Sequence, residues 1–310
     1  MNPLTNIKRI YFIGIGGIGM SALARYFNTQ GVIVSGYDKT PTPLTDNLMQ
    51  EGINIHFEDD LNQIDKDAEV VVYTPAIPSA HAELNFYRDH HYNVVKRSDV
   101  LQWITENAFT IGIAGTHGKT TTTSMTAHIL RHTEFGCNAF LGGIASNYDT
   151  NFWSHEKNVV VVEADEYDRS FLKLSPNIAV ITAVDPDHLD IYGEAEEVKK
   201  SFGEFVHKLQ YNGIAILNDQ LDLQYEGNCI RYGKQSGSAA LYSNIKIEDH
   251  HFCFDYSFKS NSARVLNALP GFHNIENACA AITACLSLKL PLKPLLEAAG
   301  NFKGVKRRFE

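Results

Sequence analysis

Residues 114–125, AGTHGKTTTTSM, combine the residue types that a phosphate-binding loop needs. Glycines expose backbone N–H groups to a phosphate, a lysine contacts the terminal phosphates, and a hydroxyl can join Mg²⁺. The common form of this loop has a glycine five places before its Gly-Lys pair. Here Ile113 occupies that place, and the nearest preceding glycine is Gly115, three places from Gly118. The sequence therefore predicts ATP binding on a shortened loop, by Gly115, Thr116, His117, Gly118, Lys119, Thr120 and Thr121.

Acidic residues follow two further apolar runs. NVVVVEAD, residues 158–165, ends in acidic residues, and NIAVITAVD, residues 177–185, leads into DPDHLD. The carboxyl ends of parallel strands meet at one edge of a sheet, where ligands of such folds bind. Because Mg²⁺ prefers oxygen ligands, Glu163 is a predicted metal ligand. His188 suits magnesium less well, and from the residues alone we expect it to be a hydrogen-bonded histidine at a strand end.

The segment GIGGIG offers a second binding turn. Gly14, Gly16 and Gly19 match the GxGxxG spacing between an apolar run and a helical pattern, and Asp38 follows 19 residues after Gly19. Such a turn lets the backbone approach a diphosphate at the positive end of a helix, and an acid so placed often binds ribose hydroxyls. The pattern predicts a dinucleotide or nucleotide-sugar site, and the alternative is a tight turn without a ligand. The candidate residues are Gly14, Ile15, Gly16, Gly17, Ile18, Gly19, Met20 and Asp38.

Two asparagines begin a later helical pattern. Asn274 and Asn277 lie one turn apart in GFHNIENACAA, residues 271–281. An asparagine amide can contact an adenine edge or a ribose, but asparagine at a helix start is most often a cap. The spacing alone favours the cap.

Strands and helices that alternate along the chain must position these groups. Such alternation is typical of parallel sheets with crossover helices. It predicts an α/β protein with an N-terminal Rossmann-like parallel-sheet domain and a central P-loop-type ATPase α/β domain. The expected strands are 9–15, 32–37, 68–74, 109–115, 158–165, 177–185 and 213–218, with a small antiparallel patch at 239–258. The expected helices lie at 20–27, 44–49, 98–107, 198–209, 273–288 and 294–299.

Composition limits the classes of function. The chain has 310 residues, a net charge of −9 and 44% hydrophobic residues, which is typical of a globular protein in solution. The negative balance argues against nucleic-acid binding, and no apolar run reaches the about 18–20 residues of a membrane span. The five cysteines form no CxxC pair, which argues against a zinc site or a disulfide framework and favours a cytoplasmic location.

Together these stretches resemble the Mur ligase family, the ATP-dependent amide-bond enzymes of bacterial peptidoglycan synthesis. The family carries the shortened loop GTxGKT, which GTHGKT matches. The resemblance implies a UDP-sugar-binding domain at 1–106 and a central ATP-binding domain at 107–301. At 302–310 it implies the start of a hinge to an amino-acid-binding domain that this sequence lacks, so we expect the chain to be inactive alone. The other stretches that carry the resemblance are GIGGIGMSALA, SGYD, EADEYD, DPDHLDIY, GFHNIENACAA and FKGVKRRFE.

The resemblance also implies roles for single residues. Lys119 would contact the β and γ phosphates of ATP. Thr120 and Glu163 would bind a first Mg²⁺, and His188 would serve a second Mg²⁺ that bridges phosphate and substrate. Lys119, Glu163 and His188 are therefore the expected catalytic residues. The residues that match further ATP contacts of the family are Asn274, Asn277 and Arg308.

Within the family, GIGGIGMS with GTHGKTTTT is most similar to ligases that join L-alanine to UDP-N-acetylmuramate. The expected reactants are UDP-N-acetylmuramate, L-alanine and ATP, with an acyl phosphate as intermediate. The alternative is a ligase that attaches recycled murein tripeptide to the same sugar nucleotide. Outside the family, an NAD-dependent oxidoreductase would use GIGGIG but leaves the second loop and the acidic strand ends unexplained. A nucleotide-binding regulator without catalytic activity is a further alternative.

Overall fold

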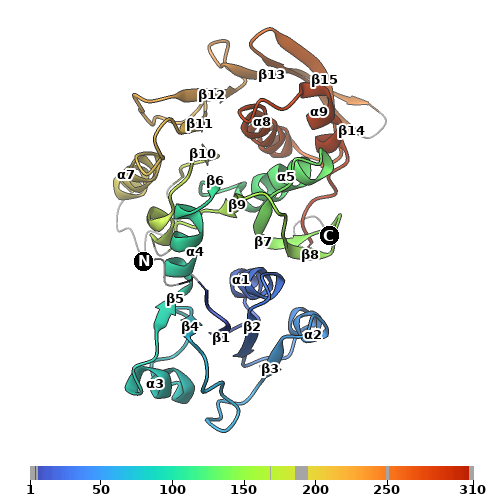
Figure 1. The fold of residues 1–310 in the computed structure, drawn as a ribbon. Helices are drawn as coiled ribbons and strands as arrows, with labels where there is room; N and C mark the ends of the chain where they lie inside the picture. Colours follow the sequence, from blue (N-terminus) through green and yellow to red (C-terminus); the bar gives the residue numbers. More distant parts are fainter. Residues whose placement is uncertain (1–3, 5, 168, 186–194, 249–250, 307–310) are drawn as a thin grey trace. The chain divides into compact units, whose positions relative to one another are not determined.

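The computed structural model describes residues 4, 6–167, 169–185, 195–248 and 251–306. The chain divides into two compact units. One comprises Met1–Asn107 with Asn151–Ser154, and the other comprises Ala108–Thr150 with His155–Glu310. Each unit contains a β-sheet with helices packed on it (Figure 1). Within the described residues, no helix is long and apolar enough to cross a membrane.

The first unit contains a five-stranded parallel sheet in the order β3-β2-β1-β4-β5. The direction in which strands are added reverses at β1, and ligands of such folds bind beside the carboxyl ends of the strands at this point. The glycine-rich turn follows β1 directly, so the predicted Rossmann-like fold is confirmed. The strands are β1 (Arg9–Ile13), β2 (Ile33–Tyr37), β3 (Asn54–His56), β4 (Val70–Tyr73) and β5 (Val94–Lys96). The helices are α1 (Ile18–Thr29), α2 (Pro43–Gln50), α3 (Ala82–Asp89) and α4 (Arg97–Glu106).

A cluster of polar side chains surrounds the N-terminal end of α3. The two Asp59 carboxylate oxygens accept the first two N–H groups of this helix, at 2.8 and 3.0 Å. Glu83, which is fully buried, accepts the Tyr11 hydroxyl at 2.6 Å and lies 2.7 Å from His56 Nε2. Burial and the Glu83 carboxylate raise the pKa of Tyr11, so its phenol stays a donor. Asp59, His81 and Glu83 together have the residue types of a metal site. However, the carboxylate oxygens of Asp59 and Glu83 already accept hydrogen bonds from the start of α3 and from buried side chains.

The second unit is built on a sheet with the strand order β15-β14-β13-β12-β11-β10-β6-β9-β7. Neighbouring strands from β13 to β7 are parallel, whereas β13, β14 and β15 pair antiparallel, which confirms the predicted patch. The strands of the parallel part are β6 (Phe109–Ala114), β7 (Asn138–Ala145), β9 (Val159–Glu163), β10 (Ile178–Ile181), β11 (Ile214–Asn218) and β12 (Cys229–Gly233). The remaining strands are β8 (Thr150–Trp153), β13 (Ala240–Glu248), β14 (His251–Phe258) and β15 (Asn261–Asn267).

Helices cover both faces of this sheet (Figure 1). Helix α5 packs against α8 and α9 on one face, and α7 lies against the short helix η1 and β10 on the other. The bounds are α5 (Lys119–His132), η1 (Ser170–Lys173), α7 (Ala195–Val206), α8 (Phe272–Leu286) and α9 (Leu292–Gly300).

Helix α5 is buried although its first half is almost entirely polar. Residues 120–123 are at most 4% exposed. The Thr123 hydroxyl donates to the Lys119 carbonyl at 2.8 Å, and the Thr126 hydroxyl donates to the Thr122 carbonyl at 2.7 Å. Because such bonds satisfy the hydroxyls within the helix, a threonine-rich helix can be buried. The first turns of α5 can therefore be buried without leaving these hydroxyl groups unsatisfied.

His128 connects the other end of α5 to α9. The residue is 2% exposed, its Nε2 lies 2.9 Å from the Ala298 carbonyl oxygen, and its Nδ1 lies 2.7 Å from the Tyr148 hydroxyl. A neutral ring can donate through Nε2 and accept through Nδ1, which satisfies both partners. Burial lowers the pKa of His128 to about 4, because the imidazolium would lose its hydration.

Acid is expected to destabilise the second unit through His128. Between pH 6.5 and about 4 the unfolded state binds this proton and the folded state does not, so stability falls as the pH falls through this window. The two pKa values give a loss of about 2 kcal/mol between pH 7 and pH 5. Urea denaturation at both pH values should show a smaller loss in His128→Gln than in the parent. The control is the exposed His207→Gln, and an equal pH dependence in parent and His128→Gln would contradict the prediction.

Candidate active site

The phosphate loop joins β6 to α5. Gly115 has a φ of +138° and Gly118 a φ of +81°, a region of backbone conformation that favours glycine. A Cβ on Gly118 would also lie 2.5 Å from Asn277 Oδ1. Among the described residues, no hydrogen bond engages the backbone N–H groups of residues 118–121. These donors point from the positive end of α5, which makes the loop suited to an anion.

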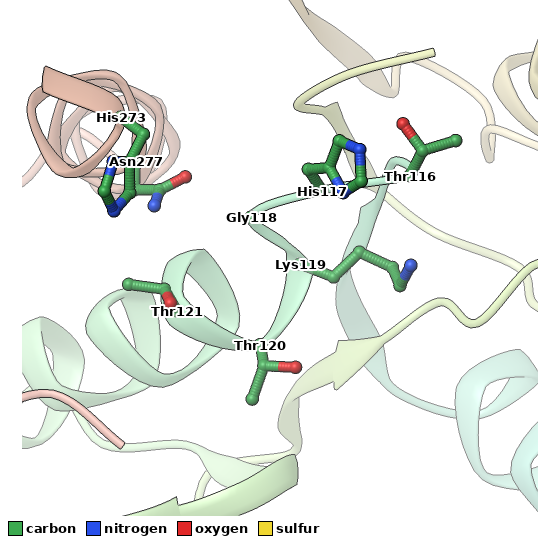
Figure 2. Close-up of a pocket in the computed structure, with 8 residues that line it drawn as sticks. All are labelled: Thr116, His117, Gly118, Lys119, Thr120, Thr121, His273 and Asn277. Atoms are coloured by element: carbon green, nitrogen blue, oxygen red, sulfur yellow. The ribbon is translucent and has the colours of Figure 1, made fainter. Parts of the chain in front are cut away.

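A cavity of about 490 Å³ lies at this loop. Figure 2 shows the side chains of His117 and Asn277 on opposite sides of Gly118, one carried by the loop and one by α8. The volume falls within the range of small-molecule sites. The lining residues are Thr116, His117, Gly118, Lys119, Thr120, Thr121, His273 and Asn277.

Lys119 is held by two partners. Its Nζ donates to the Gly115 carbonyl oxygen at 2.7 Å and to Glu166 Oε1 at 2.8 Å. The Glu166 side chain is 1% exposed and that of Lys119 is 13% exposed, so this ion pair is largely shielded from solvent. The structure thus places a buried carboxylate beside the lysine of the loop.

Thr120 brings the loop into contact with the acidic strand end. Its hydroxyl donates to Glu163 Oε1 at 2.9 Å, and Glu163 ends β9 beside β6. In the neighbouring strand β7, a Cβ on Gly142 would overlap the Glu163 carboxylate, so glycine leaves the space that this group fills. A hydroxyl and a carboxylate oxygen side by side are the ligand types that Mg²⁺ prefers, so these residues fit the predicted metal.

The prediction that the asparagines cap α8 is wrong. The N-cap of α8 is Gly271 and no side chain caps it, because the helix begins before either asparagine. The fully buried Asn274 donates to the Pro270 carbonyl at 2.6 Å and accepts from Asn277 Nδ2 at 3.2 Å. Asn277 accepts the Thr122 hydroxyl at 3.1 Å. Of the two asparagines, only Asn277 lines the cavity. Asn274 fixes the position of the Asn277 side chain by accepting its amide N–H.

The turn between β1 and α1 forms a second cradle in the first unit. Gly14 has a φ of +87° and its N–H donates to the Tyr37 carbonyl at 2.8 Å. Asp38 Oδ2 accepts the Gly16 N–H at 2.7 Å, so the predicted ribose ligand braces the turn. In the described chain, no hydrogen bond engages the N–H groups of residues 18–20, which begin α1. These donors suit a phosphate at the positive end of the helix.

The remaining predicted residues of this turn contribute differently. Ile15 and Met20 are 0% and 2% exposed and pack into the core, so their side chains are structural. Gly17 is the N-cap of α1. Arg97, at the start of α4, packs on Gly19: a Cβ there would lie 3.4 Å from Arg97 Cδ and Cζ. No hydrogen bond or ion pair within the described segments engages this half-buried guanidinium, whose donors suit a diphosphate.

Two predicted residues, His188 and Arg308, lie outside the residues that the structure describes. Three residues outside the cavity lining that the structure places at the candidate sites were missed from the sequence. Glu166 stands in the acidic run EADEYD, where only Glu163 was singled out. Gly142 belongs to a glycine pair in FLGGIA, which can signal a close approach within a strand. Arg97 has no motif that could have indicated it.

The sequence also matches known protein families. Residues 9–108 match the Mur ligase family catalytic domain. Residues 113–285, more than half of the chain, match the Mur ligase middle domain. The chain belongs to the Mur ligase family. This Mur ligase is 46% identical over 312 residues to the UDP-N-acetylmuramate–L-alanine ligase of Flavobacterium psychrophilum, a match that covers 99% of the chain and 68% of that relative.

Further Mur ligases resemble the chain in sequence and fold. The UDP-N-acetylmuramate–L-alanine ligase of Porphyromonas gingivalis is 43% identical over 316 residues, covering 98% of the chain and 69% of the relative. The crystal structure of the UDP-N-acetylmuramate–alanine ligase of Thermotoga maritima has a TM-score of 0.85 at 30% identity, covering 97% of this Mur ligase and 70% of that chain. The UDP-N-acetylmuramate:L-alanyl-gamma-D-glutamyl-meso-diaminopimelate ligase of Neisseria meningitides has a TM-score of 0.87 at 26% identity, covering 97% and 100%.

Proposed function

We propose that this Mur ligase holds the ATP and UDP-N-acetylmuramate sites of a UDP-N-acetylmuramate–L-alanine ligase, which makes a peptidoglycan precursor. The observation that carries the proposal is the joint position of Lys119, Thr120 and Glu163 at one edge of the second sheet. Relatives at 43–46% identity are named for this reaction. Residues 1–106 would bind the UDP-sugar and 107–301 ATP, and 302–310 would begin the hinge to an amino-acid-binding domain. The five cysteines are free, which suits a cytoplasmic enzyme.

The reaction must first activate a carboxylate, which is a poor electrophile. An oxygen of the lactyl carboxylate attacks the γ-phosphorus of ATP, and the bond from that phosphorus to the β–γ bridging oxygen breaks. The products are an acyl phosphate and ADP. The amine of L-alanine then attacks the acyl carbon, a proton leaves the nitrogen, and the tetrahedral intermediate expels phosphate to give the amide.

Charge neutralisation is the main task of the site in the first step. Two unit negative charges 4 Å apart repel by about 4 kcal/mol at an effective dielectric constant of 20. Lys119 and the N–H groups of residues 118–121 would hold the phosphates against this repulsion. Mg²⁺ bound by Thr120 and Glu163 would supply further positive charge at the phosphate oxygens. On the first unit, Arg97 and the N–H groups of residues 18–20 would hold the diphosphate of the sugar nucleotide.

The alternatives fit less well. A ligase for murein tripeptide would use the same sugar nucleotide, but the 26% identical Neisseria protein supports this alternative less than the relatives at 43–46% identity support the alanine ligase. An NAD-dependent oxidoreductase would not need the second loop. In addition, Asp38 Oδ2 accepts the Gly16 N–H, so this oxygen is already engaged and is not free to accept a ribose hydroxyl of NAD.

Phosphate release tests the proposed function. The assay needs the protein extended to the length of its relatives, of which this chain spans 68% in the first case. We expect phosphate release from ATP and Mg²⁺ only when UDP-N-acetylmuramate and L-alanine are both present, with L-serine and glycine as weaker substrates. Faster release with murein tripeptide would favour the recycling ligase. Binding of NADH in place of UDP-N-acetylmuramate by this chain would contradict the proposal.

A further inference from the structure

Glu166 has no role in the function proposed above, yet it is one of the least exposed acidic residues at the site. It follows β9 by three residues, and its side chain is 1% exposed. Its Oε1 accepts from Lys119 Nζ at 2.8 Å. A buried carboxylate is stable only while it is paired or hydrogen-bonded. Glu166 therefore keeps Lys119 close to it.

The Lys119 ammonium has three N–H donors, and within the part of the chain that the structure describes two of them are used. One donates to the Gly115 carbonyl oxygen at 2.7 Å and one to Glu166 Oε1. Two anchors at nearly the same distance fix the position of Nζ and leave one donor for a ligand. Figure 2 shows that the Lys119 side chain leaves the loop on the side of Gly118 opposite Asn277.

The same pairing offsets the charge of the lysine. The Glu166 carboxylate is in contact with Lys119, so its negative charge repels a triphosphate that approaches the lysine. The bound nucleotide in the ground state is therefore attracted less strongly than it would be by a lysine without this partner. A fixed donor has the opposite effect on the chemical step. Groups that do not need to reorganise stabilise the charge of the transition state best, whereas a mobile lysine would follow the phosphates of the bound nucleotide.

We propose that Glu166 is a positioning residue, which holds Lys119 in the geometry of phosphoryl transfer at the expense of ground-state nucleotide affinity. This inference rests on the proposed function, because it assigns Lys119 to the transferred phosphate. Removing the Glu166 charge should therefore tighten nucleotide binding and slow turnover at the same time. A role in folding alone would weaken both.

Glu166→Gln tests the proposal because it keeps the size and removes the charge. Calorimetric titration of this chain with ADP and Mg²⁺ should show a Kd about five- to tenfold lower than the parent's. In the extended protein, kcat should fall at least about thirtyfold while the KM for ATP falls. Glu166→Asp, which keeps the charge and withdraws it by one carbon, should leave the Kd for ADP within about twofold and recover part of the lost kcat.

Asp165→Asn is the matched control. It removes the same charge one residue away, where Asp165 accepts the Tyr167 N–H at 3.2 Å. It should change neither the Kd for ADP nor kcat by more than about twofold. An ADP Kd in Glu166→Gln that is unchanged or raised, or a kcat equal to the parent's, would overturn the proposal, and so would an equal gain of ADP affinity in Asp165→Asn. If Glu166→Gln does not fold, Glu166→Asp decides: a lower kcat at unchanged ADP affinity supports the proposal, and parental kcat overturns it.

The experiment separates this inference from the proposed function. Failure to release phosphate with UDP-N-acetylmuramate and L-alanine would remove the proposed reaction, whatever the Glu166 variants do. ADP binding by the chain still reports whether Glu166 offsets the charge of Lys119. If the parent protein turns over normally and Glu166→Gln binds ADP more weakly than the parent, only the proposed role of Glu166 is overturned, and the proposed reaction stands.

Discussion

Replacing Lys119 with alanine is expected to lower the rate of phosphate release by about a thousandfold. Removing a preorganised group that stabilises transition-state charge typically costs a factor of about 10²–10³. Lys119 also carries the charge that the buried Glu166 needs, so the unfolding midpoint should fall as well. The measurement is single-turnover phosphate release by the extended protein at saturating ATP, at a temperature where circular dichroism shows the variant folded.

Two comparisons make this first prediction specific. Binding of UDP-N-acetylmuramate should stay within about twofold of the parent, because the glycine turn of the first unit is intact. Lys293→Ala, which removes an exposed lysine of α9, should release phosphate at the parental rate. Comparable turnover in Lys119→Ala and the parent would show that the phosphate loop does not serve the reaction.

Replacing Gly142 with alanine is expected to impair metal binding at the site, although no charged residue is replaced. The added methyl group would overlap the Glu163 carboxylate, whose carboxyl carbon would lie only 2.6 Å from it. Glu163 must then leave the Thr120 hydroxyl, which it now meets at 2.9 Å. We expect turnover to fall about a hundredfold and the Mg²⁺ concentration for half-maximal rate to rise about tenfold, as for the loss of a metal-orienting contact.

Gly237→Ala is the matched control for Gly142→Ala. A Cβ at Gly237 would meet no atom within 4 Å, so this variant adds the same methyl group in open space. Its turnover and Mg²⁺ dependence should equal those of the parent. A Gly142→Ala protein with the parental Mg²⁺ dependence would show that Glu163 does not act through the metal.

The sequence predicted most parallel strands of both sheets because they are continuous apolar runs. Strands β1, β2, β4, β6, β9, β10 and β11 all lie within the predicted ranges. The short edge strands β3 and β5, of three residues each, have too little pattern to be recognised. β7 was missed because Gly142 and Gly143 interrupt its apolar run, although their lack of side chains is what the site requires.

Residue types predicted the cradles of the site but not the contacts between them. The glycines, Lys119 and Thr120 could be found because a phosphate loop is continuous in sequence. The pairing of Lys119 with Glu166 joins positions 47 residues apart, and no spacing rule predicts it. The cap predicted at Asn274 failed because α8 begins at Phe272, two residues before Asn274, and a sequence pattern does not locate the start of a helix more closely than this.

The chain after α9 returns to the strand that borders Glu163. Val305 pairs with Ala145 at the end of β7, and the backbone N–H of Lys306 donates to the Ile144 carbonyl at 2.9 Å. Gly142 and Val305 are thus attached to the same short piece of sheet, with two residues separating Gly142 from Ala145. A displacement of residue 306 would strain β7, whose Gly142 borders the Glu163 carboxylate. Movement of the chain at residue 306 should therefore change metal binding at Glu163, and metal binding should in turn change the position of residue 306.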